Sequence, residues 1–338
     1  MKKLFTLFYI ALAVGLVFAV TGGIIVHRAD VNMGQIYEII EENLQFGDKN
    51  YEFEKSDFPD LTSGAAFTKD KTVYYPLNEF HTLEIYAEKC AVNFKPTTSD
   101  DMKIYIDCPE KLLNKVFLHT AARNGSLYVI TNWTDETAAA NGVAVTIEIP
   151  EDYKGGYSVN TNKCTVDLGD IDSSMDISFN LLDTTVKSGK LTAGDFTFEM
   201  CSTLFNSESI FSRGSIDISA ESTTMNIDRL NSTYIKLLSS SGTYNLKNIT
   251  GGLTADMQTS TLNLDFNTVK GNVSVTSETG SVNVVIPHNA PVSLHHEESY
   301  SSFKENVKWT DKNSTNKNYR YIIDTNVRFS LVTLSEKK

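Results

Sequence analysis

Residues 239–294 read SSSGTYNLKNITGGLTADMQTSTLNLDFNTVKGNVSVTSETGSVNVVIPHNAPVSL, and this stretch decides the fold. Short runs of alternating apolar and polar residues are separated by Ser, Thr and Gly, which is typical of strands joined by tight turns. The pattern returns about every 19 residues, roughly eight times between Ser158 and Val307. An internal repeat of this length predicts a solenoid, in which each repeat forms one coil that contacts only its neighbours.

Two largely apolar columns appear when the repeats are aligned in blocks that start at Ser158, Ser178, Thr197, Ser215, Tyr234, Gly252, Asn272 and Pro291. The second position of each block holds Val159, Phe179, Phe198, Ile216, Ile235, Leu253, Val273 and Val292. The fourth position holds Thr161, Leu181, Met200, Ile218, Leu237, Ala255, Val275 and Leu294. Residues two apart in a strand share one face, so both columns are predicted to point into the solenoid.

A second strand and a corner residue are predicted to complete each coil. The inward residues of the second strands are expected to include Val166, Leu168, Met225, Ile227, Tyr244, Leu246, Leu262, Leu264, Val282 and Val284. The corner residues are expected to be Ile171, Leu191, Ile210, Leu230, Ile249 and Val269. One coil buries too little apolar surface to offset the ordering of its backbone, so the coils must stack. The predicted fold class is therefore all-β, a single-chain β-solenoid.

The first 26 residues are predicted to form a membrane segment. Lys2 and Lys3 precede the uncharged run Leu4–Val26, which as a helix would span about 35 Å and so cross a bilayer core of about 30 Å. The two lysines are expected to stay in the cytoplasm, so a single-pass anchor would hold the body of the chain outside it. A cleaved signal peptide that ends at Val17–Ala19 is the alternative.

Residues 27–72 are predicted to form a juxtamembrane stalk with a short amphipathic helix. Asp30 can cap this helix, and its apolar residues recur at helical spacing, namely Met33, Ile36, Tyr37, Ile40 and Leu44. Residues 73–150 are expected to be an irregular β-section that caps one end of the solenoid, which occupies residues 151–338. The segment Tyr319–Leu334 is predicted to form the final cap, because an open coil presents unpaired strand edges.

Four cysteines, Cys90, Cys108, Cys164 and Cys201, leave two alternatives open. If residues 91–94 and 103–107 form a hairpin, Cys90 faces Cys108, and a location outside the cytoplasm would permit a disulfide. The other alternative is that all four are small, buried and reduced. Their spacing excludes a zinc site of the CxxC type.

The chain is acidic and carries one cluster of aspartates. The formal net charge of −12 and the pI near 5.0 suit neither nucleic acid nor an anionic membrane surface as a partner. One cluster lies in the first full coil and contains Asp167, Asp170, Asp172 and Asp176. These carboxylates could hold Ca²⁺, but they lack the spacing of known calcium loops, which favours solvated turn aspartates.

Residues suited to catalysis or metal binding form no motif. His295 and His296 are adjacent, so in a strand they point to opposite faces and cannot chelate one ion together; His288 lies seven positions earlier. Polysaccharide lyases also use parallel β-helices, yet they need acidic and basic groups stacked on one face, and here the basic residues are scattered. We therefore expect that the chain is not an enzyme and binds no cofactor. We also expect no catalytic, cofactor-binding or metal-ligating residues.

The second half of the chain resembles a known family. The run at residues 239–294, the rung GNVSVTSETGSVNVVIP and the earlier FHTLEIYAEKCAVNF and VAVTIEIPEDY are similar to the adhesin-like β-strand-repeat family of bacterial envelope proteins, a domain of unknown function. The resemblance covers residues 73–335 and implies a membrane-attached bacterial surface protein. It carries no catalytic residues over to this chain.

The leading hypothesis is a membrane-anchored extracytoplasmic β-solenoid with an adhesin-like binding or scaffolding role at the bacterial cell envelope. Its partner would be cell-wall glycan or a surface protein, with Trp133, Trp309 and Tyr300 as exposed aromatic contacts. The alternative is a regulatory or envelope-stress-sensing partner of another membrane protein. A third option is end-to-end self-assembly of solenoids.

Overall fold

The computed structural model describes residues 65–67, 72–112, 115–133, 142–288, 290–307 and 321–337, which belong to one compact unit, Asp60–Lys338. The predicted membrane segment, the amphipathic helix and Trp309 lie outside the described residues. Within the ranges just given, no helix is long and apolar enough to span a bilayer.

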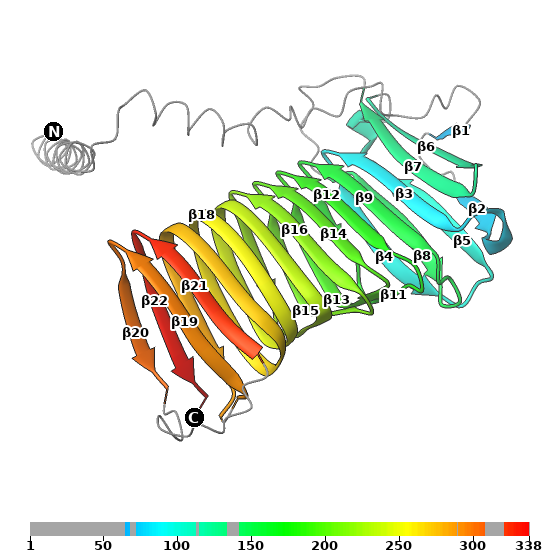
Figure 1. Cartoon of the computed structure of the whole chain (residues 1–338). Helices are drawn as coiled ribbons and strands as arrows, with labels where there is room; N and C mark the ends of the chain where they lie inside the picture. Colours follow the sequence, from blue (N-terminus) through cyan, green and yellow to red (C-terminus); the bar gives the residue numbers. More distant parts are fainter. Residues whose placement is uncertain are drawn as a thin grey trace, which may run out of the picture. The chain divides into compact units, whose positions relative to one another are not determined.

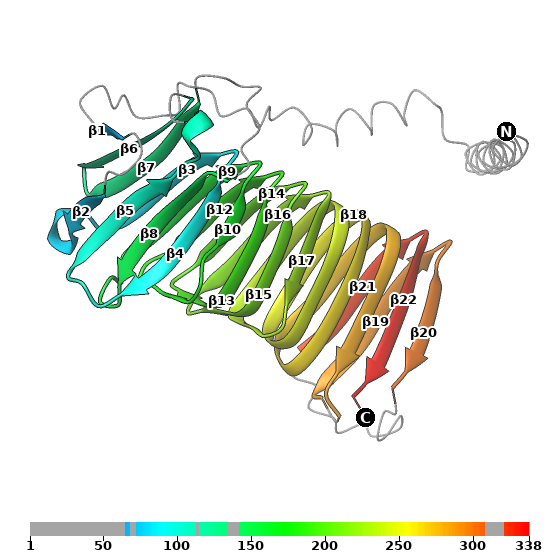
Figure 2. The same ribbon diagram turned by 180° about the vertical axis from the view of Figure 1, so that it is seen from behind.

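Parallel strands stack into two sheets that face each other across a shared core, which confirms the predicted all-β solenoid (Figure 1). The first sheet runs through β9 (Gly156–Asn162), β12 (Ile177–Leu182), β14 (Phe196–Cys201), β16 (Ser215–Glu221) and β18 (Leu230–Ile286). The second runs through β10 (Thr165–Asp167), β13 (Thr185–Ala193), β15 (Leu204–Ser212), β17 (Thr223–Ile227) and again β18, with β11 (Ile171–Asp172) also paired to β13 (Figure 2). The very long β18 passes through both sheets because its turns keep extended backbone.

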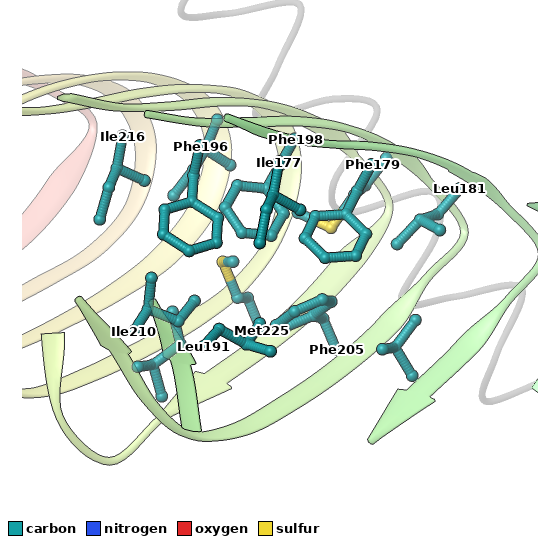
Figure 3. Packing of buried hydrophobic residues seen from close by; sticks show 14 of the residues in the cluster. Ile177, Phe179, Leu181, Leu191, Phe196, Phe198, Phe205, Ile210, Ile216 and Met225 are labelled. Atoms are coloured by element: carbon teal, nitrogen blue, oxygen red, sulfur yellow. The ribbon is translucent and has the colours of Figure 1, made fainter. Parts of the chain in front are cut away.

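The core consists of the apolar columns that the sequence predicts. All ten predicted inward residues of the second strands and all six corner residues are buried, as is the whole first column from Val159 to Val292. The second column is buried from Thr161 to Val275, and Leu294, in the last block, is only partly buried. Phenylalanines fill the middle of the stack: Phe179 and Phe198 lie face to face at 5.0 Å, and Phe205 meets them edge-on from the opposite sheet (Figure 3).

Buried hydroxyls satisfy the backbone at the corners, where the strand ladder is interrupted. At one corner, the Ser212 hydroxyl donates to the Gly194 carbonyl at 2.7 Å, and Ser232 repeats the bond to Gly214 at 2.9 Å in the next coil. At the other corner, the Thr203 hydroxyl donates to the Leu181 carbonyl of the previous coil at 3.1 Å. Short polar side chains therefore recur at the corners because they are small and can donate to these carbonyls.

The N-terminal section does not follow the order of the sequence. It contains β1 (Ala65–Phe67), β2 (Val73–Pro76), β3 (Thr82–Glu88), β4 (Ala91–Thr97), β5 (Asp101–Asp107), β6 (Val116–Arg123), β7 (Ser126–Trp133) and β8 (Ala144–Pro150), with short 3₁₀ turns at Leu77–Glu79 and Glu110–Leu112. The strand β3 lies between β7 and β9, and β4 lies between β8 and β10. The outer strands β6, β5, β1 and β2 then pair antiparallel.

The hairpin between residues 91–94 and 103–107, which the Cys90–Cys108 alternative requires, is therefore not formed. The strand β8 separates β4 from β5: Ala144 is paired with Ala91 on one side and with Asp107 on the other. Local alternation predicted both strands correctly, but β8, which follows 37 residues after β5 ends, takes the central place because it pairs parallel to β4. Cys90 and Cys108 thus lie on opposite sides of β8.

The C-terminal end is also out of sequence order, which corrects the predicted final cap. The last strands, β21 (Tyr321–Arg328) and β22 (Ser330–Glu336), lie between β18 and the earlier strands β19 (Val292–Ser299) and β20 (Ser302–Asn306). The coil of β19 and β20 is thus the outermost one, as Figure 1 shows at the orange end of the stack.

Candidate binding surface

A ladder of asparagine side chains crosses the outer face of the second sheet. Asn226 donates its side-chain amide to the Asn206 side-chain oxygen at 2.8 Å. The same bond joins the next three steps of the ladder at 2.7 Å, through Asn245, Asn263 and Asn283. The five amides are partly exposed and come from five consecutive coils of β15, β17 and β18. The ladder holds these side chains in one orientation at a spacing of about 4.8 Å, the distance between neighbouring strands.

A column of hydroxyls runs beside the ladder. Thr224 is paired with Thr243, and each precedes a ladder asparagine by two positions, so hydroxyl and amide share one face of the strand. Thr261 and Ser281 stand in the same place before Asn263 and Asn283. All four hydroxyl residues are partly exposed. The face therefore presents two parallel rows of hydrogen-bonding groups with a regular repeat.

Ion pairs border this polar face on the side opposite the hydroxyls. Arg229 contacts Glu208 at 2.6 Å, and Lys247 contacts Asp228 at 2.9 Å in the adjacent coil. These side chains are half-exposed or more, so each pair is worth at most about 1 kcal/mol. Each pair joins an acidic side chain to a basic side chain of the next coil, so the two charges of a pair offset each other.

The four turn aspartates go to separate partners. Asp170 accepts the Lys190 amide at 2.8 Å and Asp176 accepts the Asp195 amide at 2.9 Å, each in the following coil. Asp172 pairs with Lys154 at 2.9 Å, and Asp167 accepts the nearby Gly169 amide at 3.2 Å. The carboxylates thus tie turns together. Across the described ranges, no group of three or more His, Cys, Asp and Glu side chains is placed to hold a metal ion.

The three histidines singled out in the sequence also have different partners. His288 contacts Glu336 at 2.6 Å, while His295 contacts Asp324 at 2.9 Å. The hydrogen bond to Asp324 and its charge raise the pKa of His295. The His296 ring hydrogen-bonds Thr325 at 2.6 Å and stacks on Phe303 at 4.0 Å. All three fasten the outermost coils rather than converge on one point.

An aromatic pair marks the corner of the last two coils. The Tyr300 ring is 77% exposed and stacks on Phe329 at 5.3 Å, with the Arg328 guanidinium 5.2 Å from the Phe329 ring. Both aromatics have positive φ, 53° and 52°, where other coils use Lys163, Asp183, Ser202 and Ser222. The sequence indicated Tyr300 but not Phe329, because their contact depends on the inserted strand β21. Trp133 ends β7.

The asparagine ladder was also missed in the sequence, although a signal exists. The triplets TMN, TYN, TLN and SVN end at Asn226, Asn245, Asn263 and Asn283, at intervals of 18 to 20 residues. An alignment of polar positions would have revealed this column as readily as the apolar ones.

The chain was compared with known families, curated proteins and solved structures. A family model described as Toastrack DUF4097 matches residues 80–328, close to the span of the resemblance seen in the sequence. The structure is similar to those of a candidate adhesin from Bacteroides fragilis (12% identity, 81% of this chain and 97% of that chain, TM-score 0.37) and one from Parabacteroides merdae (11%, 79% and 96%, TM-score 0.34). A candidate cell adhesion protein from Clostridium sporogenes matches at 12% identity over 81% of this chain and 100% of that chain, with a TM-score of 0.20. No curated protein matches the sequence.

Proposed function

We propose that this chain, which belongs to the Toastrack DUF4097 family, is a non-catalytic, adhesin-like binding or scaffolding protein of the bacterial cell envelope. The uncharged run Leu4–Val26 would anchor it in the membrane as a single pass, with the solenoid outside the cytoplasm. The partner would be a cell-wall glycan or a surface protein.

The observation that carries the proposal is the double row of amides and hydroxyls on the second sheet. A side-chain amide has two N–H donors and an oxygen with two acceptor sites. An inner ladder member such as Asn245 uses one donor and one acceptor site for its neighbours. Its second N–H donor and second acceptor site remain for a ligand. Since the ladder and the strands hold these groups in place, a ligand would meet a preorganised surface and lose little affinity to side-chain ordering.

Saturable binding is the first test. The full chain in detergent would be mixed with isolated cell wall, purified glycans and host matrix proteins, with and without Ca²⁺, and bound protein would be measured against concentration. The variant Thr243→Val, Thr261→Val, Ser281→Ala removes three hydroxyls from the face, including one that accepts from Asn283 at 3.4 Å, and keeps the bonds between the asparagines. The control Ser178→Ala, Thr197→Val removes hydroxyls at paired positions of the first sheet.

The proposal expects binding to one class of partner that the triple variant weakens at least tenfold and the control leaves unchanged. Equal loss in both variants would place the contact elsewhere. If the wild-type chain binds none of these and instead co-purifies with a membrane protein, the regulatory role is favoured. Polar substitution of Met33, Ile36 and Ile40 should then abolish that co-purification.

A further inference from the structure

Two of the four cysteines lie side by side on neighbouring coils. The Thr165 amide donates to the Cys90 carbonyl at 3.2 Å, and the register pairs Ala91 with Thr165, so Cys90 and Cys164 hold equivalent positions one strand apart. Both side chains point into the core, with exposed fractions of 4% and 6%. The proximity of the two thiols raises the pKa of Cys90, together with burial, and lowers the pKa of Cys164.

The spacing suits a disulfide between these two residues. Neighbouring strands are about 4.8 Å apart, inside the Cα separation of about 4.4–6.8 Å that a disulfide requires. Cys108 is separated from Cys90 by the whole of β8, about two strand spacings or 9.6 Å, which exceeds the limit of about 7 Å. The structure thus excludes the pair considered from the sequence and offers a different one.

Cysteine occupies a corner position that threonine holds in the next two coils. In the next two coils the same position is held by Thr184 and Thr203, whose carbonyls accept the same inter-coil bond at 2.9 Å and 2.8 Å. The Thr203 hydroxyl donates to the carbonyl two residues before it and to the previous coil, and the Cys164 thiol repeats both bonds. Threonine therefore meets the structural need of the corner. Cysteine replaces it at two positions, and these two are adjacent.

We propose that Cys90 and Cys164 form a disulfide that fastens the first coil of the chain, residues 82–97, to the solenoid coil that starts at Gly156. Both thiols are oxidised by exchange with a low-molecular-weight disulfide such as oxidised glutathione. Each cysteine gives up one proton, the Sγ–Sγ bond forms, and the S–S bond of the oxidant breaks to yield two thiols. Since both side chains are buried, the exchange takes place during folding, before the two coils close on each other.

The cross-link has a mechanical consequence for a surface protein. It closes a loop from residue 90 to residue 164, which contains the irregular strands β5 to β8. A force that pulls the two ends of the chain apart cannot extend this loop while the disulfide is intact. The hidden length is about 74 residues at roughly 3.5 Å each, or about 260 Å.

Peptide mapping tests the proposal directly. The full chain would be folded in a glutathione redox buffer and then unfolded in a denaturant that contains iodoacetamide, which blocks free thiols. The protein would then be digested and examined by mass spectrometry. We expect a linked peptide that contains Cys90 and Cys164 in most molecules. The link should persist in Cys108→Ser and Cys201→Ser and vanish in Cys164→Thr, which keeps the corner hydrogen bonds that threonine makes in the next coils.

Single-molecule extension gives a second readout. Addition of dithiothreitol should lengthen the fully extended wild-type chain by about 260 Å and leave the length of Cys164→Thr unchanged. Complete alkylation of Cys90 and Cys164 after oxidative folding would overturn the proposal. So would a link from either residue to Cys108 or Cys201.

Discussion

Replacement of Phe198 by alanine should open a cavity at the centre of the solenoid. Its side chain is fully buried and lies among three other rings: Phe179 at 5.0 Å, Phe205 at 5.2 Å and Phe196 at 5.9 Å. Phe→Ala in a core costs about 3–5 kcal/mol. The upper part of this range applies here, because the phenylalanine rings of the adjacent coils are held by backbone pairing and cannot collapse into the space.

The loss should be local before it is global. Coils of a solenoid are stabilised mainly by their neighbours, so the strands β12, β14 and β16 would open more readily than the ends of the stack. A destabilisation of about 4 kcal/mol corresponds to about a thousandfold faster amide exchange in these strands. Hydrogen exchange read by mass spectrometry would resolve it segment by segment, with urea unfolding as an independent measure.

Phe211→Ala is the matched control. The Phe211 ring is 43% exposed and lies in β15, one of the strands that surround the same core. Its loss should cost less than about 1 kcal/mol and leave exchange in β14 nearly unchanged. If Phe198→Ala costs no more than Phe211→Ala, the phenylalanine stack is not what holds these coils together, and the reasoning fails.

Three further predictions concern turns and titration. A Cβ at Gly214 would collide with the Asp195 carboxylate, so Gly214→Ala should lower the free energy of unfolding by about 1–3 kcal/mol, and Asp195→Ala should remove most of that loss in thermal unfolding. Because Asp324 raises the pKa of His295, this pair stabilises the fold below pH 6.5, and the effect fades as the pH rises through the folded pKa. In Asp324→Asn, NMR titration should show a lower pKa for His295 than in the wild type. Burial raises the pKa of Tyr244 to about 12 from 10.0, so stability falls as pH rises from 10 through 12, and Tyr244→Phe should fall less steeply in alkaline unfolding.

Local sequence patterns were sufficient for the coils themselves. Val273 and Val275 point inward because a strand has a period of two, and the pattern repeats because each coil must bury the same face against the next. Serine and threonine at the turns were expected as turn formers, and the structure shows that several of them also satisfy buried corner carbonyls. These properties depend on a residue and its nearest coils, so they can be read from one sequence.

The order of the coils at the two ends depends on a comparison between distant segments. The strands β19 and β21 both alternate, and either could pair with β18. In the structure β21 is the strand that pairs with β18, and its inward residues Ile323 and Val327 are fully buried. The equivalent inward positions in the outer coil include His296, paired with Thr325, and Glu305, paired with Leu334.

This difference explains why β21 lies between β18 and β19 rather than at the end of the stack. A coil with His296 and Glu305 at inward positions would bury a charge if another coil were stacked on it, at a cost of several kcal/mol. At the end of the stack the same residues meet water, and His296 covers Phe303 at 4.0 Å. The inward carboxylate of Glu305 and the polar His296 therefore identify the terminal coil, and they oppose the stacking of a second copy on this edge. Glu305→Leu with His296→Val should remove that barrier, and the appearance of dimers in sedimentation velocity for the variant alone would bear this out.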